Sequence, residues 1–176
     1  KNRNFLIHAI EPNPDALKIC SNKFQNEMRV KFYQFALGKT NEKMQLNITR
    51  SSNLSSFLEP DESYKSEKGS AYDLNNILKV EKKILVDIVK GDEFVAQNKI
   101  NTIEVLSLNT QGTEMDVLEG LKKTFEEGKV KSIMIEVDFS SRYGSEYGLL
   151  EVEEFMRVNN FELFDINLIK NILPIG

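Results

Sequence analysis

The sequence predicts an α/β fold whose sheet is doubly wound and mostly parallel. Short apolar runs alternate with segments of helical periodicity along the 176 residues, a pattern typical of strands joined by crossover helices. A content of 40% hydrophobic residues suffices for one core of ordinary size. We therefore expect a single domain over residues 1–176, with residues 40–90 as an insertion or lid region.

The first expected elements are a strand, a helix and a second strand. Residues 5–10 (FLIHAI) form an apolar run, after which Asn13 and Pro14 fit the N-cap and the first position of a helix. Residues 30–37 (VKFYQFAL) form the second apolar run. Cys20, the only cysteine, falls on the apolar stripe of the helix, so we expect a buried thiol.

The inserted region contains two candidate strands and a polar segment. Residues 44–48 and part of residues 84–90 alternate between polar and apolar side chains, which predicts an antiparallel pair added to the main sheet. The stretch between them, SSNLSSFLEPDESYKSEKGS, is rich in Ser, Glu and Lys. This composition favours a long loop that acts as a lid or a linker.

The second half of the chain continues the alternation of helices and strands. Thr113 is expected to cap a helix that ends at Gly128. The other expected elements are helix 92–97, strand 103–108, strand 132–137, helix 149–158 and strand 161–166. This succession predicts right-handed crossovers between parallel strands.

Glu11 is a candidate ligand-binding residue because it directly follows the first apolar run. In an open parallel sheet, ligands bind beyond the carboxyl ends of the strands. A carboxylate there can accept hydrogen bonds from both ribose hydroxyls of an adenosyl cofactor or of a nicotinamide dinucleotide. Glu11 is equally consistent with a solvated acid near a helix start. Its position alone leaves both interpretations open.

Four segments together resemble one enzyme family. In their order and spacing, IHAIEPNP, VKFYQFALGKTNEKMQL, VDIVKGDEFVAQNKINTIEVLSLNTQGTEMDVLEGL and IMIEVDF resemble the FkbM-type family of S-adenosylmethionine-dependent methyltransferases over residues 5–166. The most specific pieces are the EPNP turn and the segment around Gln111, Gly112 and Glu114, and LEGL supports them. The resemblance implies a Rossmann-like methyltransferase fold and O-methylation of a small molecule or a glycan.

The resemblance also implies which residues would bind the cofactor, S-adenosylmethionine. Glu11 would hold its ribose, and Asn13 of the same EPNP turn would also bind it. A turn at Ala36 and Leu37 would frame its adenine.

On the acceptor side, the candidates are residues at the carboxyl ends of the later strands and in the Ser-rich segment. Glu136 interrupts its apolar strand near the carboxyl end, and either Glu136 or Glu114 would act as base on the acceptor hydroxyl. Glu114 is equally consistent with a purely structural role at a helix start. The other expected catalytic or substrate-binding residues are Asn109, Gln111, Ser52 and Asn53, the last two in the Ser-rich segment expected to lie over the acceptor.

Two features depart from the family pattern. The strand before the glycine usually ends in Asp, whereas this sequence has Asn109, and an amide is neither a carboxylate base nor a strong ligand for a hard metal ion. We therefore expect no metal site. The family's first strand and glycine-rich loop would precede residue 1, between the strands at 5–10 and 103–108 in the sheet, so we expect a sequence that is incomplete at its start, with two unpaired strand edges.

Composition and charge argue against several other partners. A net charge of -4 gives no basic surface for nucleic acid. There is neither an apolar run of membrane-spanning length nor a signal-peptide cleavage site, so we expect no membrane contact and a cytoplasmic location. His8, the only histidine, lies within a strand, where we expect a structural role. Two competing functions stay open: a nicotinamide-dependent oxidoreductase and a degenerate, non-catalytic interaction module.

Overall fold

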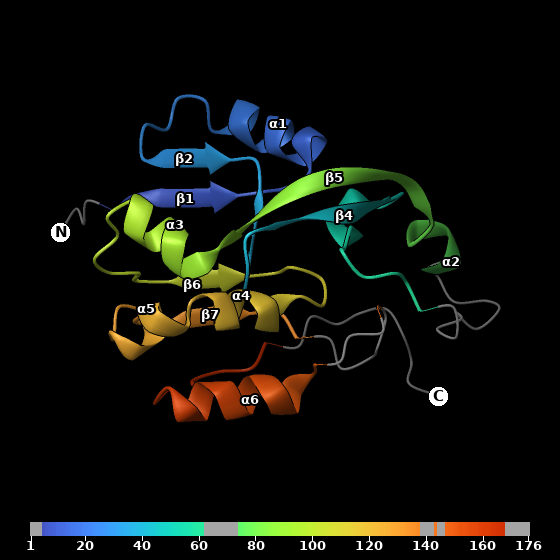
Figure 1. Cartoon of the computed structure of the whole chain (residues 1–176). Helices are drawn as coiled ribbons and strands as arrows, with labels where there is room; N and C mark the ends of the chain where they lie inside the picture. The colour runs from blue at the N-terminus through green and yellow to red at the C-terminus, as the bar shows by residue number, and fades with distance from the viewer. Residues whose placement is uncertain (1–4, 62–73, 138–142, 144–146, 168–176) are drawn as a thin grey trace.

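The computed structural model describes residues 5–61, 74–137, 143 and 147–167 (Figure 1). Its strands form two parallel pairs and one mixed sheet of three strands, which confirms the α/β class. The expected single sheet is not formed within the described residues, because no strand pairs with both β1 and β6. The doubly wound arrangement therefore stays a prediction.

The N-terminal unit is a parallel strand pair with one helix. It consists of β1 (Ile7–Ile10), α1 (Pro14–Lys23) and β2 (Val30–Tyr33). The sequence correctly predicts the start of α1: the Asn13 Oδ1 atom accepts a hydrogen bond from the Asp15 amide at 3.0 Å. The prediction of a buried thiol is wrong, because α1 has no buried residue and Cys20 is exposed.

His8 has the structural role expected of it. Its Nδ1 atom lies 2.9 Å from the Tyr33 hydroxyl, and the two rings stack with their centroids 5.6 Å apart. Burial, and after it the charge of Lys31, lowers the pKa of His8. The neutral ring packs within an aromatic cluster that includes Phe94.

The inserted region forms its own small sheet. It comprises β3 (Ala36–Gly38), β4 (Glu42–Thr49) and β5 (Val80–Lys90), with β5 in the middle. β4 and β5 are antiparallel, with Met44 opposite Val86, so the predicted pair is confirmed. Between them lie the short helices η1 (Ser52–Leu54) and α2 (Leu74–Ile77). A separate apolar cluster under this sheet consists of Ala36, Leu46, Ile48, Val86 and Ile88.

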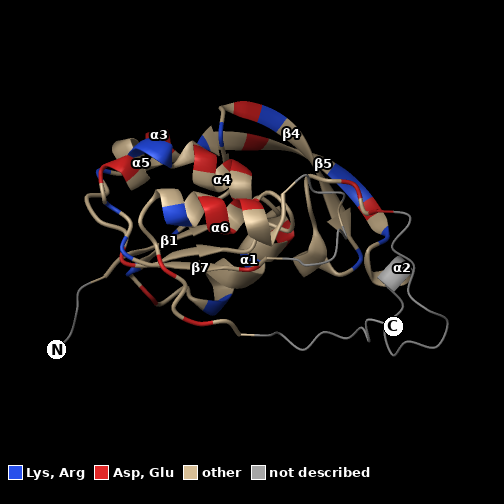
Figure 2. Cartoon of the chain, turned by 90° about the horizontal axis from the view of Figure 1, so that it is seen from below, with Lys and Arg blue, Asp and Glu red and all other residues tan. Residues whose placement is uncertain are grey.

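Charged residues of both signs recur along β4 and β5 (Figure 2). Lys43 pairs with Asp87 across the two strands at 3.2 Å, and Arg50 pairs with Glu81 at 3.0 Å. Exposed pairs of this kind contribute little to stability. Their effect is to leave this surface with mixed charge rather than one sign.

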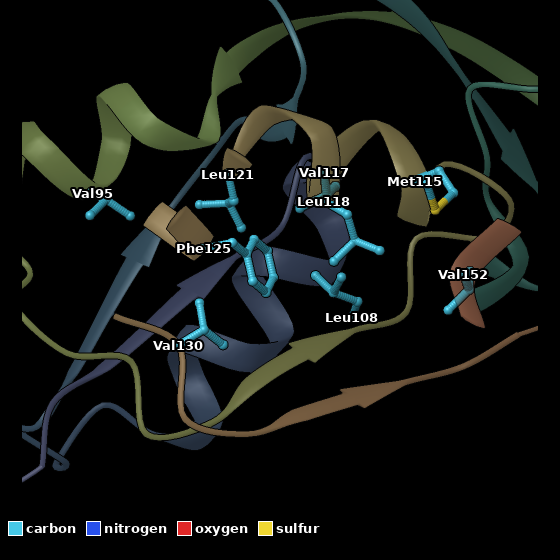
Figure 3. Close-up of a cluster of buried hydrophobic side chains, with 9 residues drawn as sticks. All are labelled: Val95, Leu108, Met115, Val117, Leu118, Leu121, Phe125, Val130 and Val152. Carbon is cyan, nitrogen blue, oxygen red and sulfur yellow. The ribbon is translucent and has the colours of Figure 1, made fainter. Parts of the chain in front are cut away.

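The main core is formed by the second parallel pair and the helices that pack around it (Figure 3). The strands are β6 (Leu106–Leu108) and β7 (Ile133–Ile135), and the helices are α3 (Gly91–Gln97), α4 (Glu114–Gly120), α5 (Lys122–Glu126) and α6 (Leu149–Val158). The buried members of the core are Val95, Leu108, Met115, Val117, Leu118, Leu121, Phe125, Val130 and Val152. The strand expected at 161–166 is not formed, and Leu163 and Phe164 are exposed because no neighbouring strand pairs with this segment.

Two glycines bring α4 against β3. A Cβ atom on Gly120 would lie 2.0 Å from the Gly38 carbonyl oxygen, which is far closer than any van der Waals contact. Gly120 therefore lets the end of α4 touch the strand backbone to backbone. This contact explains in physical terms why a glycine stands in the LEGL segment.

The inner edges of the two parallel pairs have no partner strand among the described residues. β1 pairs only with β2, and β6 pairs only with β7. Figure 1 shows the strands in the order β2, β1, β6, β7, so the two unpaired edges belong to the inner strands. This arrangement agrees with the expectation of a further strand between them, which stays a prediction.

Candidate functional site

The first group of candidate residues lies where β1 ends and α1 begins. The Glu11 amide donates to the Tyr33 carbonyl, which extends the β1–β2 pairing by one residue. The Glu11 Oε1 atom accepts a hydrogen bond from the Asn13 amide at 2.8 Å, and its other oxygen has no hydrogen bond among the described residues. Burial raises the pKa of Glu11, and the bond from Asn13 partly opposes that shift. Glu11 thus keeps one carboxylate oxygen without a hydrogen bond among the described residues, and its side chain is partly shielded from water.

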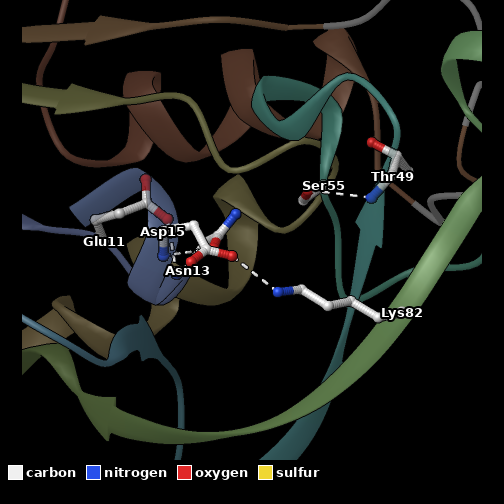
Figure 4. Close-up of polar contacts among 6 residues, drawn as sticks. All are labelled: Glu11, Asn13, Asp15, Thr49, Ser55 and Lys82. Atoms are coloured by element: carbon white, nitrogen blue, oxygen red, sulfur yellow. Dashed lines mark hydrogen bonds and ion pairs between the residues drawn. The ribbon is translucent and has the colours of Figure 1, made fainter. Parts of the chain in front are cut away.

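Asn13 supplies an unused donor beside this acceptor. The residue is only 2% exposed, and while its Oδ1 atom caps α1, its Nδ2 atom has no partner among the described residues. A buried amide without a partner is costly. Figure 4 shows both side chains at the start of α1. Between them the two residues have one acceptor and one donor without a hydrogen bond among the described residues.

The inserted sheet reaches this turn through an ion pair. The Lys82 Nζ atom on β5 donates to the Asp15 carboxylate at 2.8 Å (Figure 4). Ala36 and Leu37 lie in strand β3 and not in the turn that was expected, and Ala36 is buried in the apolar cluster of this sheet. Their assignment to the adenine stays a prediction.

The second group lies in the turn between β6 and α4. Gln111 has a φ of 55° and Gly112 has a φ of 101°. The left-handed region suits glycine, whereas a residue with a side chain pays on the order of 1 kcal/mol there. The turn is therefore strained at Gln111 and needs contacts that hold it.

Glu114 holds this turn from the side of α4. One carboxylate oxygen accepts from the Thr110 amide at 2.7 Å, and the other accepts from the Gly112 amide at 3.0 Å. Both oxygens are thus engaged by the backbone. This geometry favours the structural interpretation of Glu114 over a role as base.

Glu136 and Asn109 form the polar pair at the ends of β6 and β7. The Glu136 amide donates to the Leu108 carbonyl, which places the two strand ends side by side. The Asn109 Nδ2 atom donates to Glu136 Oε2 at 2.7 Å, and Gln111 Nε2 donates to Asn109 Oδ1. Glu136 keeps one carboxylate oxygen without a hydrogen bond among the described residues. That oxygen is available to accept a proton from a hydroxyl group.

The predicted acceptor residues of the Ser-rich segment lie in η1 at the surface. Ser52 and Asn53 are exposed, and Asn53 Oδ1 accepts from the Ser51 hydroxyl at 2.6 Å. The residue that reaches the turn is Ser56, only 1% exposed, whose hydroxyl donates to the Gln111 carbonyl at 2.7 Å. The sequence analysis missed Ser56, because nothing in SSNLSS distinguishes one serine from another.

Tyr143 is a second residue that the sequence analysis missed. It is 4% exposed, and its hydroxyl donates to the Leu54 carbonyl at 2.7 Å and lies 3.4 Å from Gln111 Oε1. No motif surrounds this tyrosine in the sequence, so only the tertiary structure identifies it. The structure thus brings Asn109, Gln111 and Glu136 together and adds Ser56 and Tyr143 to them.

Two further features bear on the kind of site. Within the described residues, no three His, Cys, Asp or Glu side chains gather in a way that could hold a metal ion. None of the helices in the described part of the chain is long and apolar enough to span a membrane.

Comparison with known proteins identifies a family. A protein-family model described as the methyltransferase FkbM domain matches residues 2–163, which is most of the chain. Searches of curated proteins and of solved structures gave no significant match.

Proposed function

The chain belongs to the FkbM methyltransferase family and is a methyltransferase, and we propose that it methylates an oxygen atom of a small molecule or glycan with S-adenosylmethionine as donor. When bound, this cofactor supplies an electrophilic methyl group. The proposal rests on two groups of residues: the turn after β1 and the polar pair at the ends of β6 and β7.

The observation that carries the proposal is the pair of unused polar atoms at the start of α1. Glu11 has a free carboxylate oxygen and Asn13 has a buried amide nitrogen without a partner in the described structure. A ribose hydroxyl can donate to the first and accept from the second. The two residues therefore fit the adenosine part of the cofactor.

The polar pair fits the acceptor side. Glu136 can take the proton of an acceptor hydroxyl on its free oxygen while Asn109 holds the other oxygen in place. The acceptor oxygen, relieved of its proton, would then be the nucleophile for the methyl group that the bound cofactor would supply. Much of the rate enhancement would come from holding donor and acceptor in line.

Calorimetry on the natural full-length protein, including whatever precedes residue 1, tests the cofactor. We expect S-adenosylhomocysteine to bind and NAD not to bind, and Glu11→Ala to weaken binding by about ten- to a hundredfold. Glu104→Ala, which removes an exposed carboxylate without a side-chain bond in the described structure, is the matched control. Binding of NAD alone would support the oxidoreductase, and binding of neither would support the interaction module.

A radiolabelled methyl donor tests the reaction. Incubation of the full chain with a panel of hydroxylated small molecules and oligosaccharides should give methylated product with at least one acceptor. Glu136→Gln should lower turnover with little change in affinity for S-adenosylhomocysteine, because the lost group acts on the acceptor. Equal loss of both would place Glu136 on the cofactor side and contradict the proposal.

A further inference from the structure

We propose that Ser56 and Tyr143 are positioning residues that hold the strained Gln111 turn and thereby orient Asn109 and Glu136 towards the acceptor. The inserted region would in this way form part of the acceptor site. The inference rests on the proposed function and deepens it. Neither residue needs to touch the acceptor.

The turn has one side that Glu114 does not hold. Glu114 binds the amides of Thr110 and Gly112, which point towards α4. The carbonyl of Gln111 belongs to the residue with the unfavourable φ, and Glu114 does not contact it. The Gln111 carbonyl and the Gly112 amide form one peptide group, which Glu114 holds at its N–H, and a donor to its oxygen fixes the group from the other side as well.

Ser56 provides that donor from a rigid support. Its backbone forms two hydrogen bonds with Asn47 of β4, at 2.9 and 3.2 Å. Its hydroxyl accepts from the Leu58 amide at 3.0 Å and donates to the Gln111 carbonyl at 2.7 Å. The single proton of the hydroxyl is thus directed at Gln111. At 1% exposure the bond is shielded from water.

Tyr143 restrains the side chain of the same residue. Its hydroxyl carries one proton, which goes to the Leu54 carbonyl at 2.7 Å, the shorter of its two contacts. The oxygen of the Gln111 side chain lies 3.4 Å away and packs against the hydroxyl as a weak contact. The tyrosine therefore fills the space between Leu54 and Gln111.

Two hydrogen bonds in series connect the Gln111 side chain to the Glu136 carboxylate. Gln111 Nε2 donates to Asn109, and Asn109 Nδ2 donates to Glu136 at 2.7 Å. Each amide can donate in this direction only while Gln111 stays in place. Loss of the contacts to Gln111 would release the carboxylate that accepts the acceptor proton.

Two variants test the inference in the full chain. Ser56→Ala and Tyr143→Phe each remove one hydroxyl, and we expect each to lower kcat by about ten- to a hundredfold. Affinity for S-adenosylhomocysteine should change by less than about twofold, since Glu11 and Asn13 are untouched. Amide hydrogen exchange at Thr110 and Gly112 should become about fivefold faster, as expected for the loss of one hydrogen bond.

Two controls separate positioning from general loss of stability. Tyr33→Phe also removes a tyrosine hydroxyl with two contacts, yet it should leave kcat and the exchange of the turn unchanged. Gln111→Gly relieves the strain at this position. Gln111→Gly keeps the backbone carbonyl that Ser56 binds but removes the strain that the bond opposes, so in that background Ser56→Ala should accelerate exchange at Gly112 less than it does in the wild-type chain.

The outcomes distinguish this inference from the proposed function. Unchanged kcat in both variants, or equal losses of kcat and of cofactor affinity, would overturn the positioning role. Absence of any S-adenosylhomocysteine binding by the wild-type chain would instead refute the proposed function. The exchange measurement then still decides whether Ser56 and Tyr143 hold the turn, and unchanged exchange would refute that as well.

Discussion

Glu11 is subject to two opposing effects of pH. Burial raises its pKa above the ordinary value of 4.5, so the group contributes stability below that value and loses it as pH rises through the higher, folded-state pKa. Ribose hydroxyls need the charged carboxylate as acceptor. We therefore expect affinity for S-adenosylhomocysteine to rise with pH across the same interval in which this contribution to the stability of the free protein is lost.

Glu11→Gln isolates this effect. The amide keeps the shape but does not titrate, so we expect weaker binding whose dependence on pH is flat in the acid range. Calorimetry from about pH 4.5 to pH 7 measures both forms. An identical pH dependence in the variant would show that another group is responsible.

Asn109 determines whether the polar pair attracts a metal ion. Asn109→Asp would place a second carboxylate against Glu136 across the 2.7 Å contact, where two negative charges repel unless a proton or a cation lies between them. We expect methyl transfer to fall by about tenfold and millimolar Mg²⁺ to restore part of it. Asn109→Ala removes the same bond without adding charge, and its activity should not respond to Mg²⁺. An equal Mg²⁺ response in both variants would contradict this account.

Single residues differ in how far the sequence reveals them. The cap at Asn13 was predictable because a cap acts on the amide two positions on, and the place of Glu136 at a strand end was predictable because it interrupts an apolar run, whereas its role stays a prediction. Ser56 and Tyr143 act on Gln111 across 55 and 32 positions of sequence, and no local pattern records such a contact. Cys20 lies on the apolar stripe of its helix, but no described element packs closely enough against that stripe to bury it.

At the scale of elements, the junction of α4 with β3 depends on the absence of a side chain. We expect Gly120→Ala to lower the free energy of unfolding by about 3 kcal/mol, because the added methyl would overlap the Gly38 carbonyl. Gly148→Ala is the control, since its Cβ would lie 3.6 Å from the nearest atom, a carboxylate oxygen of Glu151. Urea denaturation compares them, and equal midpoints would show that α4 can shift away.

Strand pairing was predictable where a neighbour was present. The alternation in β4 and β5 predicted their antiparallel pairing because one face of each strand covers an apolar cluster. The apolar residues at 161–166 also predicted a strand, but no strand pairs with that segment among the described residues. Periodicity therefore indicates a capacity to form a strand, and the neighbour decides whether it forms.

At the scale of the molecule, the inner edges of β1 and β6, unpaired among the described residues, predict that a further strand could pair with both. We expect a polypeptide with a strand-forming segment ahead of Phe5 to melt at a higher temperature. Amide exchange should slow in β1 and in β6 together, because one strand would pair with both edges. Slower exchange in only one of them would show that the added segment does not lie between the pairs.

The hydrogen bond from Tyr143 to Leu54 has a consequence for folding kinetics. It joins residues 89 positions apart, so the entropy of closing a long loop must be overcome before it can form. Helical turns and the β4–β5 ribbon need shorter closures and should form earlier. Assembly of the acceptor side would then be among the last events of folding, and a chain whose core is only partly formed would lack the geometry for catalysis.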